Sequence, residues 1–275
     1  MDEPSENRPL AWQPFTPKGV AAFAYATFGR VFLVQLLVAL ASATIIVWLI
    51  YRDWFPVVQN AIEQLPPQGA IRNATLDFRA DAPKRLAENR FLSVAVDLDH
   101  SGDVRSPAHL QVEFGRNDLE IVSLLGFAKL PYGRGWETPM NRTDLIPWWG
   151  AWAPPILGIA ALLVIVTLLI VWACLATTYC LGVWLVGFFA NRDLSASGSW
   201  RLAATALMPG AVLMIIGIVG YGLGLLELPG LAVVLAAHFV TQWFYLLVSV
   251  FFLPRHPAAA KAKGNPFAPP SKPET

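Results

Sequence analysis

The segment Asp97–Asp103 (DLDHSGD) holds the residue types that could most directly do chemistry. Its acidic residues alternate and a glycine stands sixth, which resembles the start of a calcium-binding loop. Such a loop closes with a bidentate glutamate at its twelfth position, and that position here is Ala108. Aspartate, serine and glycine also favour a tight turn after a strand. We therefore interpret this segment as a turn.

A second candidate is the pair His238 and Gln242, one helical turn apart within a long apolar run, with Thr241 beside them. Polar side chains inside a membrane helix usually face protein and can mark a substrate or proton path. One histidine with one glutamine is also typical of ordinary hydrogen bonding between helices. No Asp, Glu, Lys or Arg lies in the apolar runs to pair with them. The structural interpretation is favoured, and a transport path is the alternative.

Catalytic motifs are absent from the sequence: it has no HExxH, GxSxG, phosphate-binding loop or CxxC. Two cysteines, Cys174 and Cys180, are six residues apart and would point to different faces of a helix, so no disulfide is expected. The histidines show no ligand spacing for a metal; they are His100, His109, His238 and His256. The sequence therefore predicts no catalytic, cofactor-binding or metal-ligating residue, no cofactor and no enzymatic activity.

Long stretches without charge determine the predicted architecture. No Lys, Arg, Asp or Glu occurs between Asp144 and Arg192, a run of 47 residues, and shorter charge-free runs span 31–51, 202–226 and 228–254. A helix that crosses a bilayer needs about 20 apolar residues. Charged residues make up only 14% of the chain, against about 25% in soluble domains. These patterns predict an integral membrane protein.

The long charge-free run admits two interpretations, because residues 154–190 could cross the membrane once or twice. A helix over 155–189 would be about 52 Å long, more than the bilayer thickness. Two crossings would need a turn, and no segment there has turn chemistry. One crossing keeps the basic segment Arg192–Arg201 and the C-terminal lysines on the side of the N-terminus, as the positive-inside rule favours. We expect one crossing and four transmembrane helices.

The predicted fold is a membrane all-α protein with an inserted extracytoplasmic α+β domain that contains a small antiparallel sheet. A short interfacial helix is expected at Gly19–Gly29, and a short helix at Val57–Leu65. Alternating or β-branched segments predict a strand meander; they are Ile71–Arg79, Phe91–Asp97, His109–Phe114 and Leu119–Leu125. The expected divisions are a cytoplasmic arm 1–30, a first transmembrane helix 31–51, the inserted domain 52–147, a membrane domain 148–253 and a disordered cytoplasmic tail 254–275.

The end of the membrane domain should be a helical hairpin, 203–226 and 231–253, with an external turn at Glu227–Gly230. Gly217, Gly220, Gly222 and Gly224 favour close helix packing, and Gly220 with Gly224 forms a GxxxG motif. Pro209 should kink the first helix of this hairpin or mark its first turn.

The layout and three local patterns resemble a known family. The patterns are Phe15–Gly19 (FTPKG) before a lone first helix, Val94–Gly102 in the strand domain, and Leu194–Gly210 after the second helix. They are similar to an uncharacterised bacterial family of inner-membrane proteins with one extracytoplasmic strand domain, and more distantly to the Yip family. The resemblance implies a non-enzymatic membrane component.

The expected function is therefore that of an interaction or scaffold protein of the bacterial inner membrane, with both termini cytoplasmic and the extracytoplasmic domain as its recognition surface. A small transport component, or an accessory subunit of a transporter with a path near His238 and Gln242, is the alternative. The expected partners are the lipid bilayer and either another membrane protein or further copies of this chain. The net charge of +1 gives no basis for binding nucleic acid.

Overall fold

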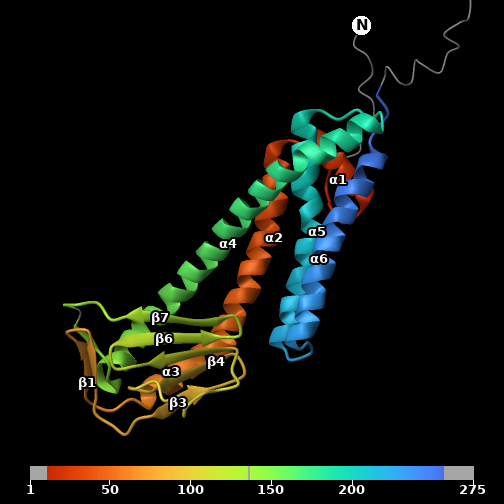
Figure 1. Cartoon of the computed structure of the whole chain (residues 1–275). Coiled ribbons are helices and arrows are strands. Elements are labelled where there is room, and N and C mark those ends of the chain that lie inside the picture. Colours follow the sequence, from red (N-terminus) through yellow and green to blue (C-terminus); the bar gives the residue numbers. More distant parts are fainter. Residues whose placement is uncertain (1–10, 136, 257–275) are drawn as a thin grey trace, which may run out of the picture. The chain divides into compact units, whose positions relative to one another are not determined.

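The computed structural model describes residues 11–135 and 137–256 (Figure 1). Residues 1–10 of the predicted arm and 257–275 of the predicted tail lie outside this range. The chain divides into two compact units. We name them the helical unit, residues 1–45 with 163–275, and the sheet unit, residues 46–162.

Four helices in the described chain are long and apolar enough to cross a membrane, as the charge-free runs predicted. They occupy Phe28–Glu63, Arg142–Phe189, Ala196–Gly222 and Leu228–Phe252. The 47-residue run forms one helix without a turn, α4 (Arg142–Phe189), which contains three prolines. Its first turn is capped by Asn141, whose Oδ1 accepts a hydrogen bond from the Asp144 backbone N–H at 3.0 Å. The helix thus begins inside the segment 52–147 that was expected to be extramembrane.

The first long helix is continuous where the sequence predicted two separate helices. Helix α2 (Phe28–Leu49) passes through a π-helical turn, η2 (Ile50–Trp54), into α3 (Phe55–Glu63). Pro56 follows the π-helical turn at the start of α3, where the backbone hydrogen-bond pattern of the long helix is already irregular. The proline therefore does not separate the two predicted helices.

The segment predicted as an interfacial helix is instead part of the core of the helical unit. Thr16 caps α1 (Pro17–Ala22), which continues into the 3₁₀ turn η1 (Phe23–Tyr25). Val20 and Phe23 are fully buried in a cluster that includes residues of α5 (Ala196–Gly222). The segment was predicted to lie at the membrane interface because its sequence alone does not show that α5 covers it.

Helix α5 and α6 (Leu228–Val248) form the predicted hairpin and run side by side (Figure 1). The two helices approach each other closely at Gly210 and Gly217 of α5. A Cβ added at these positions would lie 2.6 Å from Gln242 and 2.4 Å from Val234 of α6. The predicted GxxxG pair is not at this interface: Gly220 faces Leu226, and Gly224 has φ +76 in the turn. Pro209 lies inside α5, well after its first turn.

The sheet unit contains two sheets, with strand orders β2-β1-β8 and β3-β4-β5-β6-β7. The strands are β1 (Gly69–Arg72), β2 (Thr75–Phe78), β3 (Lys84–Glu88), β4 (Leu92–Val96), β5 (Leu110–Phe114), β6 (Asp118–Ser123), β7 (Gly126–Pro131) and β8 (Glu137–Pro139).

Two features of these sheets differ from the predicted meander. Ile71–Arg79 is a hairpin and not one strand, because Asn73 and Ala74 both have positive φ and reverse the chain. Strands β4 and β5 pair in parallel, so only β5, β6 and β7 form an antiparallel meander. A parallel pair needs a long connection, and residues 97–109 supply it. The position of these residues over the sheet determines the site described below.

The five-stranded sheet has one apolar and one polar face. Alternation along β5 places Leu110, Val112 and Phe114 in the core with α3, and turns Gln111 and Glu113 to the opposite face. Both Gln111 and Glu113 are nevertheless buried. Buried polar groups on a strand require partners from elsewhere in the chain.

Candidate functional site

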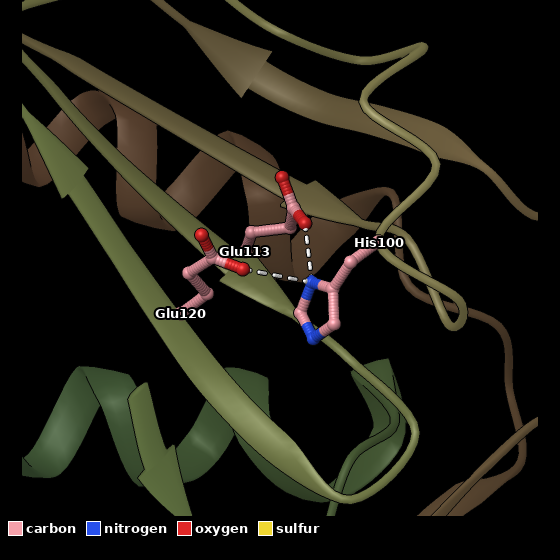
Figure 2. Close-up of side chains that lie close together, drawn as sticks. All are labelled: His100, Glu113 and Glu120. Carbon is pink, nitrogen blue, oxygen red and sulfur yellow. Dashed lines mark hydrogen bonds and ion pairs between the residues drawn. The ribbon is translucent and has the colours of Figure 1, made fainter. Parts of the chain in front are cut away.

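His100 lies between acidic side chains of β5 and β6 (Figure 2). Its Nδ1 is 2.6 Å from Glu113 Oε1 and 3.2 Å from Glu120 Oε2. Its Nε2 is 2.6 Å from Asp118 Oδ1. Glu113 is completely buried, and the side chain of Glu120 is 5% exposed. We name His100, Glu113, Asp118 and Glu120 the His100 centre.

The register of β5 and β6 brings the two glutamates together. Glu113 is directly opposite Glu120 in this antiparallel pair. Like charges at opposite positions destabilise a sheet, and burial increases the cost. A cation or a hydrogen-bond donor close to both carboxylates offsets this cost, and His100 Nδ1 lies within 3.2 Å of one oxygen of each (Figure 2).

The turn that follows β4 places the His100 ring beside the two glutamates. Asp97 Oδ2 accepts hydrogen bonds from Ser101 Oγ at 2.9 Å and from the Gly102 N–H at 3.0 Å. His100 and Gly102 have φ +51 and φ +84, values that reverse the chain within a few residues. The segment that resembled a calcium loop thus forms an Asp/Ser/Gly turn, whose role is to place an imidazole over the sheet.

Gly115, at the end of β5, leaves room for the imidazole. A Cβ at this position would be 2.3 Å from His100 Nε2 and 2.8 Å from Asp118 Oδ1. No side chain fits at such distances, so the ring can lie against the backbone only because residue 115 is glycine.

A second set of side chains holds the carboxylates. Gln111 Nε2 donates to Glu113 Oε2 at 2.8 Å. Lys129 Nζ is 3.3 Å from Glu120 Oε2, and an Arg105 guanidinium nitrogen is 3.6 Å from Glu120 Oε1. Burial opposes the charged form of His100, but its hydrogen bonds to Glu113 and Asp118 outweigh this effect and raise its pKa above the ordinary value.

The centre can do two things chemically. As an imidazolium, His100 can link the 97–103 turn to β5 and β6 through charge-assisted hydrogen bonds. Alternatively, His100 Nδ1 and one oxygen each of Glu113 and Glu120 can bind a metal ion, since the three atoms lie within 4.8 Å of one another. No nucleophile of the serine or cysteine type belongs to the centre among the residues described.

Comparison with known proteins adds no assignment. No family model, curated protein or solved structure matches this chain. The site is therefore interpreted from its own geometry, and the resemblance to the inner-membrane family stays a prediction.

Spacing along the sequence did not reveal the His100 centre, because its members come from a turn and two strands that meet only in the fold. Glu113 and Glu120 each stand between apolar neighbours of an alternating strand, the pattern of a residue on the solvent-facing side of a sheet. No signal in the sequence therefore indicated that these two residues are buried, and their partner could not be identified without the register. His109 and His256, the other histidines outside the apolar runs, are not members of the centre.

The structure places His238 and Gln242 at the interface between α5 and α6. Gln242 Nε2 lies 2.9 Å from His238 Nε2, and Gln242 is almost fully buried. The Cγ of Gln242 and the backbone O of His238 are the atoms that a Cβ at Gly210 would meet. The pair therefore takes part in helix packing.

Asp97 provides a test of the turn beneath the ring. Burial alone would raise the pKa of Asp97. The hydrogen bonds that its carboxylate accepts from Ser101, Gly102 and Asp99 together lower the pKa by more, so the net shift is downward. Because the pKa of Asp97 is lower in the folded protein than in the unfolded chain, its ionised carboxylate stabilises the fold at pH values above the unfolded-state pKa. This stabilisation is lost as the pH falls through the folded-state pKa. We expect Asp97→Ala to cost about 1–3 kcal/mol at neutral pH, and the difference from wild type to shrink below pH ~4.

The measurement is the opening free energy of residues 97–103 from amide hydrogen exchange in the detergent-solubilised full chain. Asp99→Ala is the matched control, because Asp99 is exposed and its pair with Arg116 at 3.1 Å should contribute at most about 1 kcal/mol. Equal losses in the two variants would contradict the role assigned to Asp97.

Proposed function

We propose that this chain is a non-enzymatic, multi-pass protein of the bacterial inner membrane that binds a protein partner through its inserted sheet unit. In this proposal the four apolar helices span the membrane, both termini are cytoplasmic and the sheet unit is extracytoplasmic. Basic residues in the segment 192–201 and in the C-terminal tail support this orientation through the positive-inside rule.

The observation that carries the proposal is an exposed apolar edge on the five-stranded sheet. Strand β7 is the last strand of that sheet and is exposed along its whole length. Large apolar side chains on this strand and on the preceding turn are exposed to solvent; they are Leu124, Leu125, Phe127 and Leu130. Leu125 is fully exposed, and Phe127 is 69% exposed. We name these four residues with β7 the apolar edge.

A strand edge of this kind offers two forms of attachment. Its outward backbone N–H and C=O groups can pair with an extended segment of another protein, and the apolar side chains can contact alternate residues of that segment. Exposed apolar clusters on a surface otherwise rich in charge commonly mark interaction sites. The expected partner is therefore a protein that adds a β-strand to β7.

The test is purification of the full chain in a mild detergent at native expression level, with quantitative mass spectrometry of the proteins retained. We expect the double variant Leu125→Asp and Phe127→Thr to lose a stoichiometric partner at least tenfold while the chain still inserts into the membrane. Amide exchange should also slow along β7 in the isolated complex, because pairing protects backbone N–H groups.

Leu225→Asp is the matched control, since Leu225 is similarly exposed but lies in the turn between α5 and α6. The apolar edge would be excluded as the binding surface if the double variant Leu125→Asp and Phe127→Thr retained the partner. Equal loss of the partner from the double variant and from Leu225→Asp would exclude it as well. A homo-oligomer without any other protein would also contradict the proposal.

The alternative, a small transport component, depends on His238 and Gln242 as path residues. Their contact with each other and with Gly210 supports a packing role. We therefore favour the interaction protein.

A further inference from the structure

We propose that the His100 centre is a binding site for a divalent transition metal, with Zn²⁺ as its best-fitting occupant. The protein ligands are His100 Nδ1, Glu113 Oε1 and Glu120 Oε2 (Figure 2). This site does not depend on the proposed partner, although Lys129 of β7 contacts Glu120.

Two carboxylate oxygens lie close to the single proton that His100 Nδ1 can donate. A ring nitrogen carries one proton, which can be donated well to one oxygen. Two glutamate oxygens nevertheless approach Nδ1, at 2.6 Å and 3.2 Å, and the glutamates face each other across the β5–β6 pair. A metal ion at this point has several coordination positions and can satisfy both carboxylates and the ring together.

The distances between the ligand atoms are close to those of a metal site. Metal–ligand bonds of about 2.0–2.2 Å in a tetrahedral site separate the ligand atoms by roughly 3.3 Å. The separation between Nδ1 and Glu120 Oε2 is already 3.2 Å. The contact between Nδ1 and Glu113 Oε1, 2.6 Å, has to lengthen by less than about 1 Å. The two glutamate oxygens already lie within 4.8 Å of each other.

Each of the three ligands is already oriented by another side chain. A metal-bound histidine usually donates its second ring N–H to a carboxylate. Here Asp118 Oδ1 lies 2.6 Å from Nε2 and fills that role. Gln111 holds the other oxygen of Glu113, at 2.8 Å, and Arg105 lies 3.6 Å from the other oxygen of Glu120.

The charge balance agrees with this arrangement. Among the described residues, the carboxylates of Glu113, Asp118 and Glu120 face two permanent cations, Arg105 and Lys129. One negative charge is therefore left for the imidazolium proton or for a metal ion that displaces this proton from Nδ1. An imidazole nitrogen among the ligands favours zinc and similar metals over Mg²⁺ and Ca²⁺, which prefer oxygen ligands. Three protein ligands would leave a fourth position for water.

The test uses the full chain, purified in detergent and stripped of metal with a chelator, titrated with ZnCl₂ against a chromophoric competitor. We expect one zinc ion per chain with a dissociation constant in the micromolar range or tighter, and no displacement by millimolar MgCl₂. His100→Asn and Glu113→Gln each remove a ligand and should lower the affinity by more than roughly 100-fold. Asparagine is chosen at residue 100 because it tolerates the positive φ.

Two further variants separate metal binding from a general loss of structure. Asp118→Asn should lower the affinity roughly 10–100-fold while the sheet unit keeps its amide protection. Lys129→Met should raise the affinity, because it removes the ammonium that competes for Glu120 Oε2 at 3.3 Å. A variant that merely damaged the fold could not bind zinc more tightly.

His109→Asn is the matched control and should leave binding unchanged. The zinc absorption edge should indicate nitrogen and oxygen ligands, without sulfur. Absence of stoichiometric zinc binding, sulfur ligation, or unchanged affinity in His100→Asn and Glu113→Gln would overturn the proposal and leave His100 as an ion-pair residue of the sheet.

Discussion

Replacement of Gly210 by alanine should lower the free energy of unfolding of the helical unit by about 1–3 kcal/mol, and replacement by leucine should cost more. The added Cβ would be 2.6 Å from Gln242 Cγ and 2.9 Å from the His238 backbone O. The glutamine side chain can move, but the backbone oxygen of α6 cannot move without the helix. Helices α5 and α6 would therefore have to separate.

The measurement is the apparent thermal midpoint of the full chain in detergent, with a shift of roughly 2–4 °C for each kcal/mol. Gly182→Ala is the matched control, because Gly182 lies on α4 with no atom within 4 Å of a Cβ. That variant should be neutral or slightly stabilising, since alanine is the better helix former. A Gly210→Ala midpoint equal to that of Gly182→Ala would show that the hairpin is not packed at this point.

Gly115→Ala should displace His100 from its centre. The new Cβ would lie 2.3 Å from Nε2 and 2.8 Å from Asp118 Oδ1, so either the ring or the β5–β6 turn must move. We expect a loss of about 1–3 kcal/mol in the sheet unit, as for other overpacked positions. Glu113 would then remain buried opposite Glu120 without the ring between them. Faster amide exchange in β5 and β6 would measure the effect.

Gly102→Asn is the control for this experiment. The backbone of Gly102 is also unfavourable for other residues, because its φ is +84. A side chain would nevertheless have room there, since the nearest atom to an added Cβ is 4.0 Å away. Asparagine tolerates positive φ, so this variant should change the stability by less than about 1 kcal/mol. If Gly115→Ala had no larger effect than Gly102→Asn, close contact between the ring and the backbone would not be important for stability.

The helices were predictable from sequence because their signals are local. A stretch of about 20 residues without charge predicts a long apolar helix whatever surrounds it, and the charge-free runs indeed correspond to four such helices. The same holds for the α5–α6 hairpin and for the turn at 97–103, where neighbouring residues supply the required geometry. The absence of turn chemistry in the long run also correctly favoured a single helix, α4.

Packing between helices was not predictable to the same degree. The GxxxG pair Gly220 and Gly224 was the stronger sequence motif, but Gly210 and Gly217 make the close contacts. Which glycine faces a neighbour depends on how the two helices are rotated, and spacing within one helix does not give that rotation. Burial of Val20–Ala24 likewise depends on α5, which is distant in sequence.

The sequence by itself determined the number of apolar helices, the presence of an inserted strand domain and the turn at 97–103, but not the turn at Asn73–Ala74. Only the tertiary structure decided that β4 and β5 are parallel, that Glu113 opposes Glu120 and that His100 lies between them. The physical reason is that pairing register and crossover direction are set by contacts between segments, whereas hydropathy and turn propensity are properties of single segments. His100 therefore acquired a candidate role only when the 97–109 connection was seen to cross the polar face of the sheet.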